Sequence, residues 1–535
     1  SLFCLVFSQM GRDGRNRKIL VKGVLVVGVA VDWVAGNVYW SGGDSISVCR
    51  LNDTRQYVVL HDIGQPELIA LHPVSGKMFW TDGRLGGGIF SAGLDGSNMK
   101  KLVNTSRVEG ITLDLSNNYV FWSDTIKKRI SRMNLDGSGN TVVVQDLTQG
   151  PKALAVYNST VYFVTEGAND HSSVVMFASS IYSPSSTIDP SSGASYSSSI
   201  LSLSVLTQTS HDVISDLLVL SKSSAAHDSG SNPCIGGGGC QDLCLYDGEA
   251  PRCHCHHAKL GEDGRTCQDY SSYLLYKDGE KISSLHLHDK DNPNAPLEAI
   301  KNMSAYSFAV DYDASRLYYT DMSRSVVKSV LLNGSDARIF LTNQGSVEGI
   351  ALDPIERQLF WSNENLAKIY RTALDRPESE DNSVTDAEAA TDMDSPRVIH
   401  EVLRLNHTVD RIRSIAVDHC HRNIYWCNWS YGHGLIQRSS YDGTAVRTIV
   451  TGVVFFPSAL TLDLPDGKLY WGDASLNKIE RCNLDGSNRR DVPRSMYTIF
   501  HSTALQVHGD ELYWGDAVSR SIMRTNKYSG LTTLV

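Results

Sequence analysis

Six cysteines lie close together in one short stretch of the chain, and thiols are the side chains with the most specific chemistry in it. The run Cys253-His-Cys-His-His257 would suit zinc, but structural zinc sites use paired C-x2-C arms, which are absent here. So short a segment cannot bury a core of its own. The density therefore predicts disulfides, an oxidising compartment and no metal. These cysteines are Cys234, Cys240, Cys244, Cys253, Cys255 and Cys267.

A second set of reactive side chains, the aspartates, recurs after aromatic pairs, as in Asp82, Asp124, Asp321, Asp473 and Asp516. A catalytic carboxylate would not be needed in every repeat. We therefore interpret these residues as structural acceptors of backbone N–H groups between neighbouring repeats. The aromatic pairs are expected to pack between repeats. They are Tyr39-Trp40, Phe79-Trp80, Phe121-Trp122, Tyr162-Phe163, Tyr318-Tyr319, Phe360-Trp361, Tyr425-Trp426, Tyr470-Trp471 and Tyr513-Trp514.

The segments around these pairs must supply the strands that hold them. The clearest copy runs from Ala459 to Asp473, with an apolar run, a Pro-Asp-Gly turn and an aromatic pair, and continues from Lys478 to Gly486. Such signals are typical of consecutive antiparallel strands that form a four-stranded meander. Because the pairs return about every 40 residues, the sequence predicts β-propellers, whose meanders bury their faces against one another.

The length and the charge of the chain limit its possible domain organisation and partners. With 535 residues and 41% hydrophobic residues, the chain is globular and too long for one domain. Its net charge of −10 argues against nucleic acid as a partner and favours basic protein ligands. No cofactor is expected.

Several features predict an exported chain. The apolar run Gly23 to Val31 is too short to span a bilayer, and Ser1 to Ser8 lacks the basic leader of a signal peptide. We expect a piece of a larger protein. Sequons of the N-x-S/T type are candidate glycosylation sites. They begin at Asn52, Asn104, Asn158, Asn302, Asn333, Asn406 and Asn428.

Three domains are expected, namely a propeller over residues 1–230, a small module over 231–268 and a second propeller over 269–535. In the first, Asp13-Gly14 would be the hairpin turn of a truncated N-terminal blade, and Val213 to Leu220 would close the ring by pairing with the N-terminal strand. In the second, opening strands at Tyr273 to Leu287 would need an inner partner after Val535. Both propellers are therefore expected to be incomplete.

The cysteine order from Asn232 to Cys267 is similar to that of an epidermal growth factor (EGF) module. A propeller with an aromatic-Trp-Thr/Ser/Gly-Asp (YWTD) signature, then this module, then another propeller, resembles the low-density lipoprotein receptor-related family over essentially the whole chain. The segments Ile479 to Gly486 and Ser521 to Lys527 look most like its giant endocytic, megalin-type members. The expected fold is all-β, with two YWTD-type β-propellers separated by a disulfide-rich EGF-like module.

The resemblance also implies six blades per propeller and a disulfide pattern. It pairs Cys234 with Cys244, Cys240 with Cys253, and Cys255 with Cys267. It favours a further bond between Cys420 and Cys482 and leaves Cys427 unpaired. Because Ser229 to Pro233 lacks the carboxylates of calcium-binding modules, no calcium is expected there.

Topology indicates where a ligand would bind. In each meander, the turn between strands 2 and 3 and the connection from strand 4 to the next strand 1 emerge at one end, here named the ligand end; the opposite end is the base. Loops on a rigid scaffold commonly carry binding residues. Trp429 and Tyr431 lead the candidates because aromatic residues beside charges are frequent interface anchors. The candidates are Asp44, Glu67, Arg84, Arg107, Glu109, Lys127, Glu348, Glu364, Arg411, Trp429 and Tyr431.

The resemblance implies the extracellular portion of a single-pass cell-surface receptor that cycles through endosomes and releases its ligands there as the pH falls. Its expected partners are basic or lipoprotein-associated protein ligands and neighbouring domains of the same receptor. The alternative within the family is the Wnt co-receptor branch, which uses the same alternating domains.

An enzyme is the alternative of another class. Propeller lactonases hold a metal through inner-strand carboxylates, and Glu67 and Glu109 lie at such positions on successive blades. The equivalent residues Gly28, Lys152 and Ser307 do not complete that set, and no nucleophile-base pair is evident. We therefore expect a binding protein and not an enzyme.

Overall fold

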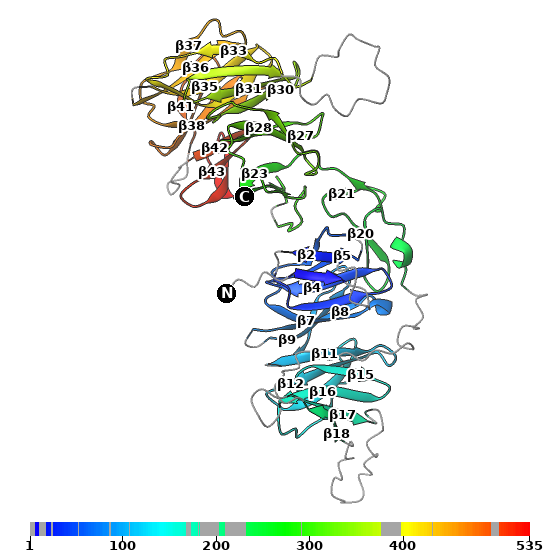
Figure 1. Cartoon of the computed structure of the whole chain (residues 1–535). Coiled ribbons are helices and arrows are strands. Elements are labelled where there is room, and N and C mark those ends of the chain that lie inside the picture. The colour runs from blue at the N-terminus through cyan, green and yellow to red at the C-terminus, as the bar shows by residue number, and fades with distance from the viewer. Residues whose placement is uncertain are drawn as a thin grey trace, which may run out of the picture. The chain divides into compact units, whose positions relative to one another are not determined.

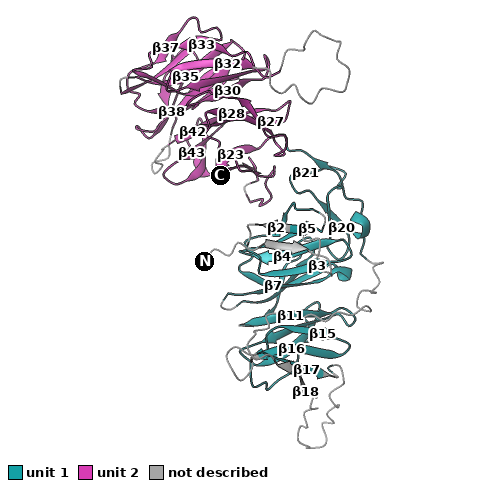
Figure 2. Cartoon of the chain, viewed as in Figure 1, with its two compact units in different colours: residues 1–271 teal, residues 272–535 magenta. Residues whose placement is uncertain are grey.

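The computed structural model is built from β-strands and divides into two compact units, unit 1 (residues 1–271) and unit 2 (residues 272–535), each described below by itself (Figures 1 and 2). This confirms the predicted all-β fold class. The structure describes residues 6–9, 18–22, 25–51, 53–84, 87–105, 107–166, 173–179, 181, 203–208, 232–289, 291–375, 397–430, 432–493 and 502–535.

Unit 1 contains four-stranded antiparallel sheets in which strands adjacent in sequence are adjacent in the sheet, as predicted for meanders. The first strands of successive sheets contact one another, so the sheets follow one another as blades. A hairpin, β1 with β2, precedes them. The strands are β1 (Val6–Gln9), β2 (Lys18–Lys22), β3 (Gly28–Asp32), β4 (Asn37–Gly42), β5 (Ser45–Arg50), β6 (Tyr57–Leu60), β7 (Pro66–His72), β8 (Lys77–Asp82), β9 (Gly88–Gly93), β10 (Lys100–Asn104), β11 (Val108–Asp114), β12 (Tyr119–Asp124), β13 (Arg129–Asn134), β14 (Thr141–Val144), β15 (Leu154–Tyr157), β16 (Thr160–Glu166), β17 (Ser173–Ser179) and β18 (Leu203–Gln208), with the 3-10 helix η1 (Pro73–Ser75).

The hairpin β1–β2 flanks Asp13-Gly14, where a hairpin turn is predicted. Asp13-Gly14 itself and the predicted closing strand Val213 to Leu220 lie outside the described residues.

Unit 2 repeats this plan. Its described part has a three-stranded sheet, β23-β24-β25, which contains the predicted opening strands, and then five four-stranded sheets. The strands are β23 (Leu274–Asp278), β24 (Lys281–Leu285), β25 (Ile300–Lys301), β26 (Phe308–Asp311), β27 (Arg316–Asp321), β28 (Val326–Leu331), β29 (Arg338–Leu341), β30 (Ile350–Asp353), β31 (Gln358–Asn363), β32 (Lys368–Ala373), β33 (His400–Arg404), β34 (Asp410–Asp418), β35 (Asn423–Ser430), β36 (His433–Ser440), β37 (Arg447–Val450), β38 (Pro457–Asp463), β39 (Lys468–Asp473), β40 (Lys478–Asn483), β41 (Arg490–Asp491), β42 (Ser502–His508), β43 (Glu511–Asp516), β44 (Ser521–Asn526) and β45 (Thr532–Leu534).

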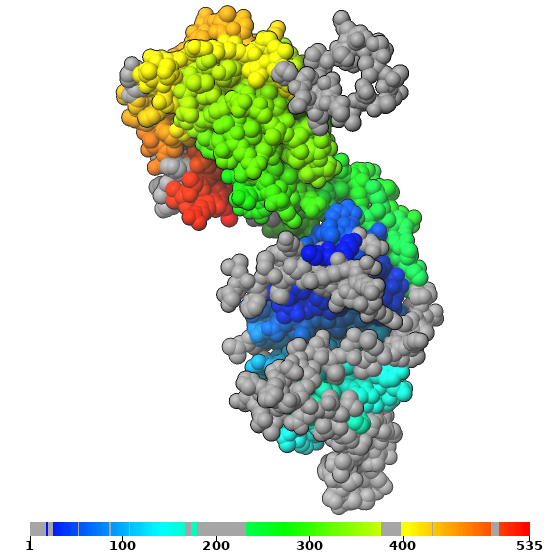
Figure 3. All heavy atoms as spheres, in the orientation of Figure 1, coloured from blue at the N-terminus to red at the C-terminus, as the bar shows by residue number. Residues whose placement is uncertain are grey.

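The aromatic pairs form the interior of both units, as predicted. Trp80 and Trp471 are fully buried on the second strands of their sheets. The clusters cross from blade to blade, since Trp471 of β39 packs with Tyr425 of β35 and Val450 of β37. The space-filling view draws all heavy atoms of these blades, coloured along the chain (Figure 3). Because such large side chains typically contribute about 3–5 kcal/mol each when buried, contacts between blades hold each unit together.

The aspartates after the aromatic pairs accept backbone hydrogen bonds, as predicted. Asp473 accepts from the N–H groups of Phe455 and Phe456 at 2.8 and 3.2 Å, and Asp82 accepts from that of Gln65 at 3.3 Å. These N–H groups belong to the connections that arrive from the preceding blade. The carboxylates therefore join each blade to the chain that enters it, which is a structural role.

Three disulfides and two short hairpins make up the module. The hairpins are β19 (Leu243–Tyr246) with β20 (Pro251–His254) and β21 (Lys259–Leu260) with β22 (Cys267–Gln268), and the 3-10 helix η3 (Ile235–Gly237) precedes them. The bonds join Cys234 to Cys244, Cys240 to Cys253 and Cys255 to Cys267, which are the partners that the resemblance implied.

The module packs against the base of the first propeller within unit 1. Leu243 and Leu245 are buried in one cluster with Tyr39 and Trp80. The side-chain amide of Asn37 donates to the Cys244 carbonyl at 3.0 Å, and the N–H of Leu94 donates to the Tyr246 carbonyl at 3.1 Å. The propeller and the module therefore share one core.

The predicted bond between Cys420 and Cys482 is wrong. Both are free thiols, with Cys420 exposed in the turn after β34 and Cys482 buried on β40 in a cluster that contains Cys427. The Cys482 side chain thus faces the interior, away from an exposed turn. Cys427 is a free thiol, as expected, and burial raises the pKa of Cys482 to about 12, which keeps this thiol protonated and unreactive.

Candidate ligand-binding site

The ligand end of unit 1 carries its charged candidates on three successive blades. Asp44 is exposed between β4 and β5, and Glu67 is exposed on β7. The guanidinium of Arg84 lies 2.8 Å from the Asp82 carboxylate. Burial alone would raise the pKa of Asp82, but hydrogen bonds from Arg84 outweigh it and hold that pKa below its usual value. Arg84 thus belongs to the structural site of its own blade.

Two further pairs lie on neighbouring connections of unit 1. Arg107 Nε is 2.7 Å from Glu109 Oε1, and Lys127 Nζ is 3.5 Å from Asp124 Oδ2. An exposed pair such as Arg107 with Glu109 contributes below about 1 kcal/mol, whereas Asp124 is buried and belongs to its own blade. In the described ranges, no three His, Cys, Asp or Glu side chains converge as a metal site. The structure therefore brings the unit 1 candidates together only in local pairs.

The ligand end of unit 2 is different, because charges from two neighbouring blades meet there. Arg413 on β34 lies 3.2 Å from Glu364 and 3.6 Å from Glu348, and its guanidinium stacks 4.8 Å from the Phe456 ring centroid. Burial, followed by the hydrogen bond with Glu364, raises the pKa of Glu348 to about 7. We call Glu348, Glu364 and Arg413 the charge cluster.

Aromatic and apolar side chains surround the charge cluster. Tyr306 precedes β26 and is 53% exposed, and burial and then the charge of Glu348 raise its phenol pKa, which places the two residues near each other. Phe455 is exposed beside Phe456 on the connection into β38, and Trp429 is exposed on β35. The ligand end of unit 2 thus combines carboxylates with exposed aromatic surface.

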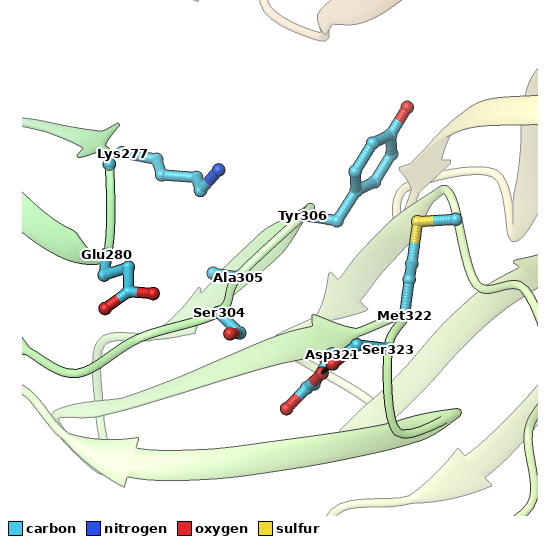
Figure 4. A pocket seen from close by; sticks show the side chains of 9 residues that line it. Lys277, Glu280, Ser304, Ala305, Tyr306, Asp321, Met322 and Ser323 are labelled. Atoms are coloured by element: carbon cyan, nitrogen blue, oxygen red, sulfur yellow. Dashed lines mark hydrogen bonds between the residues drawn. The ribbon is translucent and has the colours of Figure 1, made fainter.

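A hollow of about 280 Å³ lies beside Tyr306. Figure 4 shows Tyr306 and Met322 on one side of it and Lys277 and Glu280 on the other, with Asp321 between them below. The hollow lies between the three-stranded sheet and the sheet that begins at β26. Its mixed lining suits one amphipathic side chain of a ligand.

The remaining candidates differ in their freedom to bind. Arg411 lies opposite Trp429 in the ladder between β34 and β35, and its guanidinium donates to the backbone carbonyls of His407 and Asp410. It therefore supports its own connection while Trp429 stays available. Tyr431 lies outside the described residues.

Sequence reasoning missed Arg413, although a positional signal exists. Arg413 lies five residues before Asp418, the last residue of β34, and Glu348 lies five residues before Asp353 at the end of β30. Tyr306 has the same offset from Asp311. Listing this one position in every blade would have brought the three residues together.

Most of the predicted glycosylation sites are accessible, with one exception. Asn428 is 1% exposed, and its Nδ2 donates to Asp410 and Gln437 at 2.9 and 3.0 Å. The prediction of a glycan at Asn428 is wrong for the folded chain, because the nitrogen that would carry the sugar is buried and engaged. Asn52 lies outside the described residues. The exposed sites are Asn104, Asn158, Asn302, Asn333 and Asn406.

Comparison with known proteins agrees with this architecture. Residues 76–114 and 118–158 match the family described as low-density lipoprotein receptor repeat class B. Low-density lipoprotein receptor-related protein 5, from Mus musculus and from Homo sapiens, is 30% identical over 410 residues, which cover 74% of this chain and 22% of the relative. The vitellogenin receptor of Solenopsis invicta is 26% identical over 302 residues, 55% of this chain and 16% of the relative.

The chain therefore spans about a fifth of the length of the curated relatives it matches. Among solved structures, a chain of a nidogen/laminin complex is 24% identical, covers 48% of this chain and 89% of its own length, and has a TM-score of 0.40. No helix in the described part of the chain is long and apolar enough to cross a membrane.

The named relatives are receptors. The matched repeats, the aromatic signature and the disulfide-bonded module lead to one conclusion: the chain carries low-density lipoprotein receptor class B repeats and is similar to low-density lipoprotein receptor-related protein 5.

Proposed function

We propose that this chain is an extracellular part of a cell-surface receptor and that it binds protein ligands through the ligand end of unit 2. The observation that supports this most is the charge cluster, with Arg413 between Glu348 and Glu364 beside exposed aromatic residues. Interface hot spots combine aromatic anchors with partly desolvated charges in this way.

The charge cluster suits a basic side chain of the ligand. Two carboxylates face one guanidinium, so the cluster carries one net negative charge when both carboxylates are ionised. Because the pKa of Glu348 is raised to about 7, this carboxyl holds a proton part of the time at neutral pH. A ligand ammonium or guanidinium would replace that proton, in keeping with the net charge of −10 and with basic or lipoprotein-associated ligands.

The same chemistry gives the direction of the pH dependence. As the pH falls below about 7, Glu348 becomes neutral and its attraction for a cation is lost. We propose this as one physical cause of ligand release in an endocytic, megalin-type receptor that cycles through endosomes, anchored by a membrane segment outside these residues. The neighbouring domains of that receptor would be its other partners.

The Wnt co-receptor branch is the second candidate. It is favoured by the match to low-density lipoprotein receptor-related protein 5 over 74% of this chain. In that case the same end would bind a selective ligand without release on acidification.

Surface capture of the chain by an immobilised synthetic peptide with one Lys between Leu residues tests the proposal. We expect Glu348→Gln and Glu364→Gln each to weaken capture about tenfold at neutral pH, because each removes a charge that faces the Lys. Glu356→Gln is the matched control, since Glu356 pairs with Arg422 at the base.

Equal capture by all three variants would exclude the charge cluster as the ligand site. Wild-type capture that is the same at about pH 7.4 and about pH 5.5 would favour the co-receptor branch over the endocytic one.

A further inference from the structure

Two glycosylation sequons lie on the ligand end of unit 2. Asn302 follows β25 on the connection that carries Tyr306, and Asn406 follows β33 on the connection into β34, the strand of Arg413. Both asparagines are exposed. In chain order they bracket the two blades that begin with β26 and β30, from which Tyr306, Glu348 and Glu364 come.

The local geometry leaves these amide nitrogens available. Asn406 uses its Oδ1 to accept from the Thr408 N–H at 3.2 Å and from the Thr408 hydroxyl at 2.8 Å, so its Nδ2 points elsewhere. Asn302 has a left-handed backbone with a φ of 60°, which Asn tolerates in turns. Asn428 at the same end is excluded, because its Nδ2 is buried and bonded.

We propose that Asn302 and Asn406 carry N-linked glycans and that these glycans form a collar on two sides of the charge cluster. The inference about the partner rests on the proposed function, whereas the assignment of the two glycan sites does not depend on it. Glycans are bulky and hydrated. The collar closes the approach over the blades of β26 and β30 and over Trp429, because Arg411, the ladder partner of Trp429, donates to the carbonyl of His407 next to Asn406. It leaves open the side of Phe455. The ligand that fits is a narrow protruding loop and not a broad globular surface.

The modification needs a co-substrate of defined class, an oligosaccharide carried on a lipid pyrophosphate in the secretory pathway. The Asn Nδ2 forms a bond to the anomeric carbon of the first sugar. The bond from that carbon to the pyrophosphate oxygen breaks and the lipid pyrophosphate leaves with the electron pair. One of the two amide protons passes to solvent. No oxidant or reductant is required.

The first measurement is glycopeptide mass spectrometry of the full chain secreted from animal cells. We expect glycans at Asn302 and Asn406 and none at Asn428. An unmodified Asn302 or Asn406 would overturn the collar, whatever the result for the basic peptide. This readout requires no ligand, so its failure is distinct from failure of the proposed function.

The second measurement tests the effect of the collar on access. A single-domain antibody is selected on the enzymatically deglycosylated chain and is kept only if Tyr306→Ala and Arg413→Ala abolish its binding. We expect about tenfold weaker binding to the glycosylated chain, and recovery in the double variant Asn302→Gln/Asn406→Gln. Asn333→Gln is the matched control, because Asn333 lies in the turn between β28 and β29 at the base. Equal binding to the glycosylated and deglycosylated chains would overturn the collar.

Discussion

The bases of the two units show how one repeated blade is adapted to different neighbours. In unit 1, Asn37 begins β4 and donates to the module, and Gly76 lies just before β8 against the module backbone. In unit 2, Arg316 begins β27 and Arg357 lies just before β31. These arginines pair with Asp336 and with Asp311 and Asp375.

This difference shows that the aromatic repeat forms the blade, whereas single residues in the base turns determine which partner can pack against the base. Small neutral residues allow a module to approach the backbone of unit 1. Charged side chains fill the same positions in unit 2, next to Tyr312 and Ile355, which are 70% and 72% exposed. A partner for that base would have to meet charges and apolar groups together.

The largest loss of stability is expected for the buried tryptophans, which both units share. Trp80→Ala in unit 1 and Trp471→Ala in unit 2 should each lower the free energy of unfolding by about 3–5 kcal/mol, because each leaves a cavity between blades. Denaturant unfolding followed by tryptophan fluorescence measures this. A loss below about 1 kcal/mol in only one unit would show that its blades are not held together by this repeat.

Gly76→Arg places in unit 1 the arginine that unit 2 has at the same position, Arg357. It should separate the module from the base of unit 1. A Cβ at Gly76 would lie 2.3 Å from the Gly248 nitrogen, and φ is 64°. Gly467, before β39, has a φ of 60° and open space around it. Gly467→Arg is thus a control for backbone strain, and we expect Gly76→Arg to cost about 1–3 kcal/mol more. Equal unfolding midpoints would contradict a close module contact.

Asn37→Ala should have a smaller effect on the same contact. It leaves the Cys244 carbonyl without its partner and should cost about 1–2 kcal/mol in thermal unfolding of unit 1. Asn423 begins β35 in the same register of unit 2, so Asn423→Ala is the control. If both variants lose the same stability, the hydrogen bond to the module contributes nothing specific.

Acidification should weaken the module contact slightly through His254. Its Nδ1 lies 2.9 Å from the Tyr57 hydroxyl, and its Nε2 is buried without a hydrogen-bond partner among the described residues. Burial lowers the pKa of His254 below 6.5. The charge of Asp95 raises this pKa and the charge of Arg252 lowers it further. The unfolded chain therefore binds this proton first, and stability falls as the pH drops below about 6.5.

Hydrogen exchange of residues 251–254 at about pH 7.4 and about pH 5.5 checks this effect. After correction for the slower intrinsic exchange in acid, we expect a lower protection factor at the lower pH in the wild type and a smaller change in His254→Phe. A pH response of the same size in both would exclude His254 as its source.

The repeat made the blades predictable, because aromatic pairs like Tyr470-Trp471, five of them followed by an aspartate as at Asp473, recur along the chain on the second strand of each four-stranded sheet. The module disulfides followed from the family resemblance, since six cysteines alone allow several pairings. The charge cluster could be predicted only in part. Glu348 and Glu364 were found from topology, whereas Arg413 was not, because its contact with them depends on how two neighbouring blades converge.

Two errors have a common cause, which is that a motif does not report burial. The sequon at Asn428 is intact, but strand pairing buries the side chain between Asp410 and Gln437. Cys482 lies in the expected segment, but the alternation of β40 directs its thiol into the core. Side-chain direction in a strand changes with every residue, and segment-level resemblance does not fix it.

Hydrogen-exchange mapping of unit 2 with and without a saturating lysine-containing peptide tests the central claim most directly. We predict protection of the ligand end, at residues 303–308, 346–350 and 411–415, and unchanged exchange in the base turns at 312–316 and 354–357. Protection confined to the base turns, or to unit 1, would contradict the assignment of the ligand site to the charge cluster.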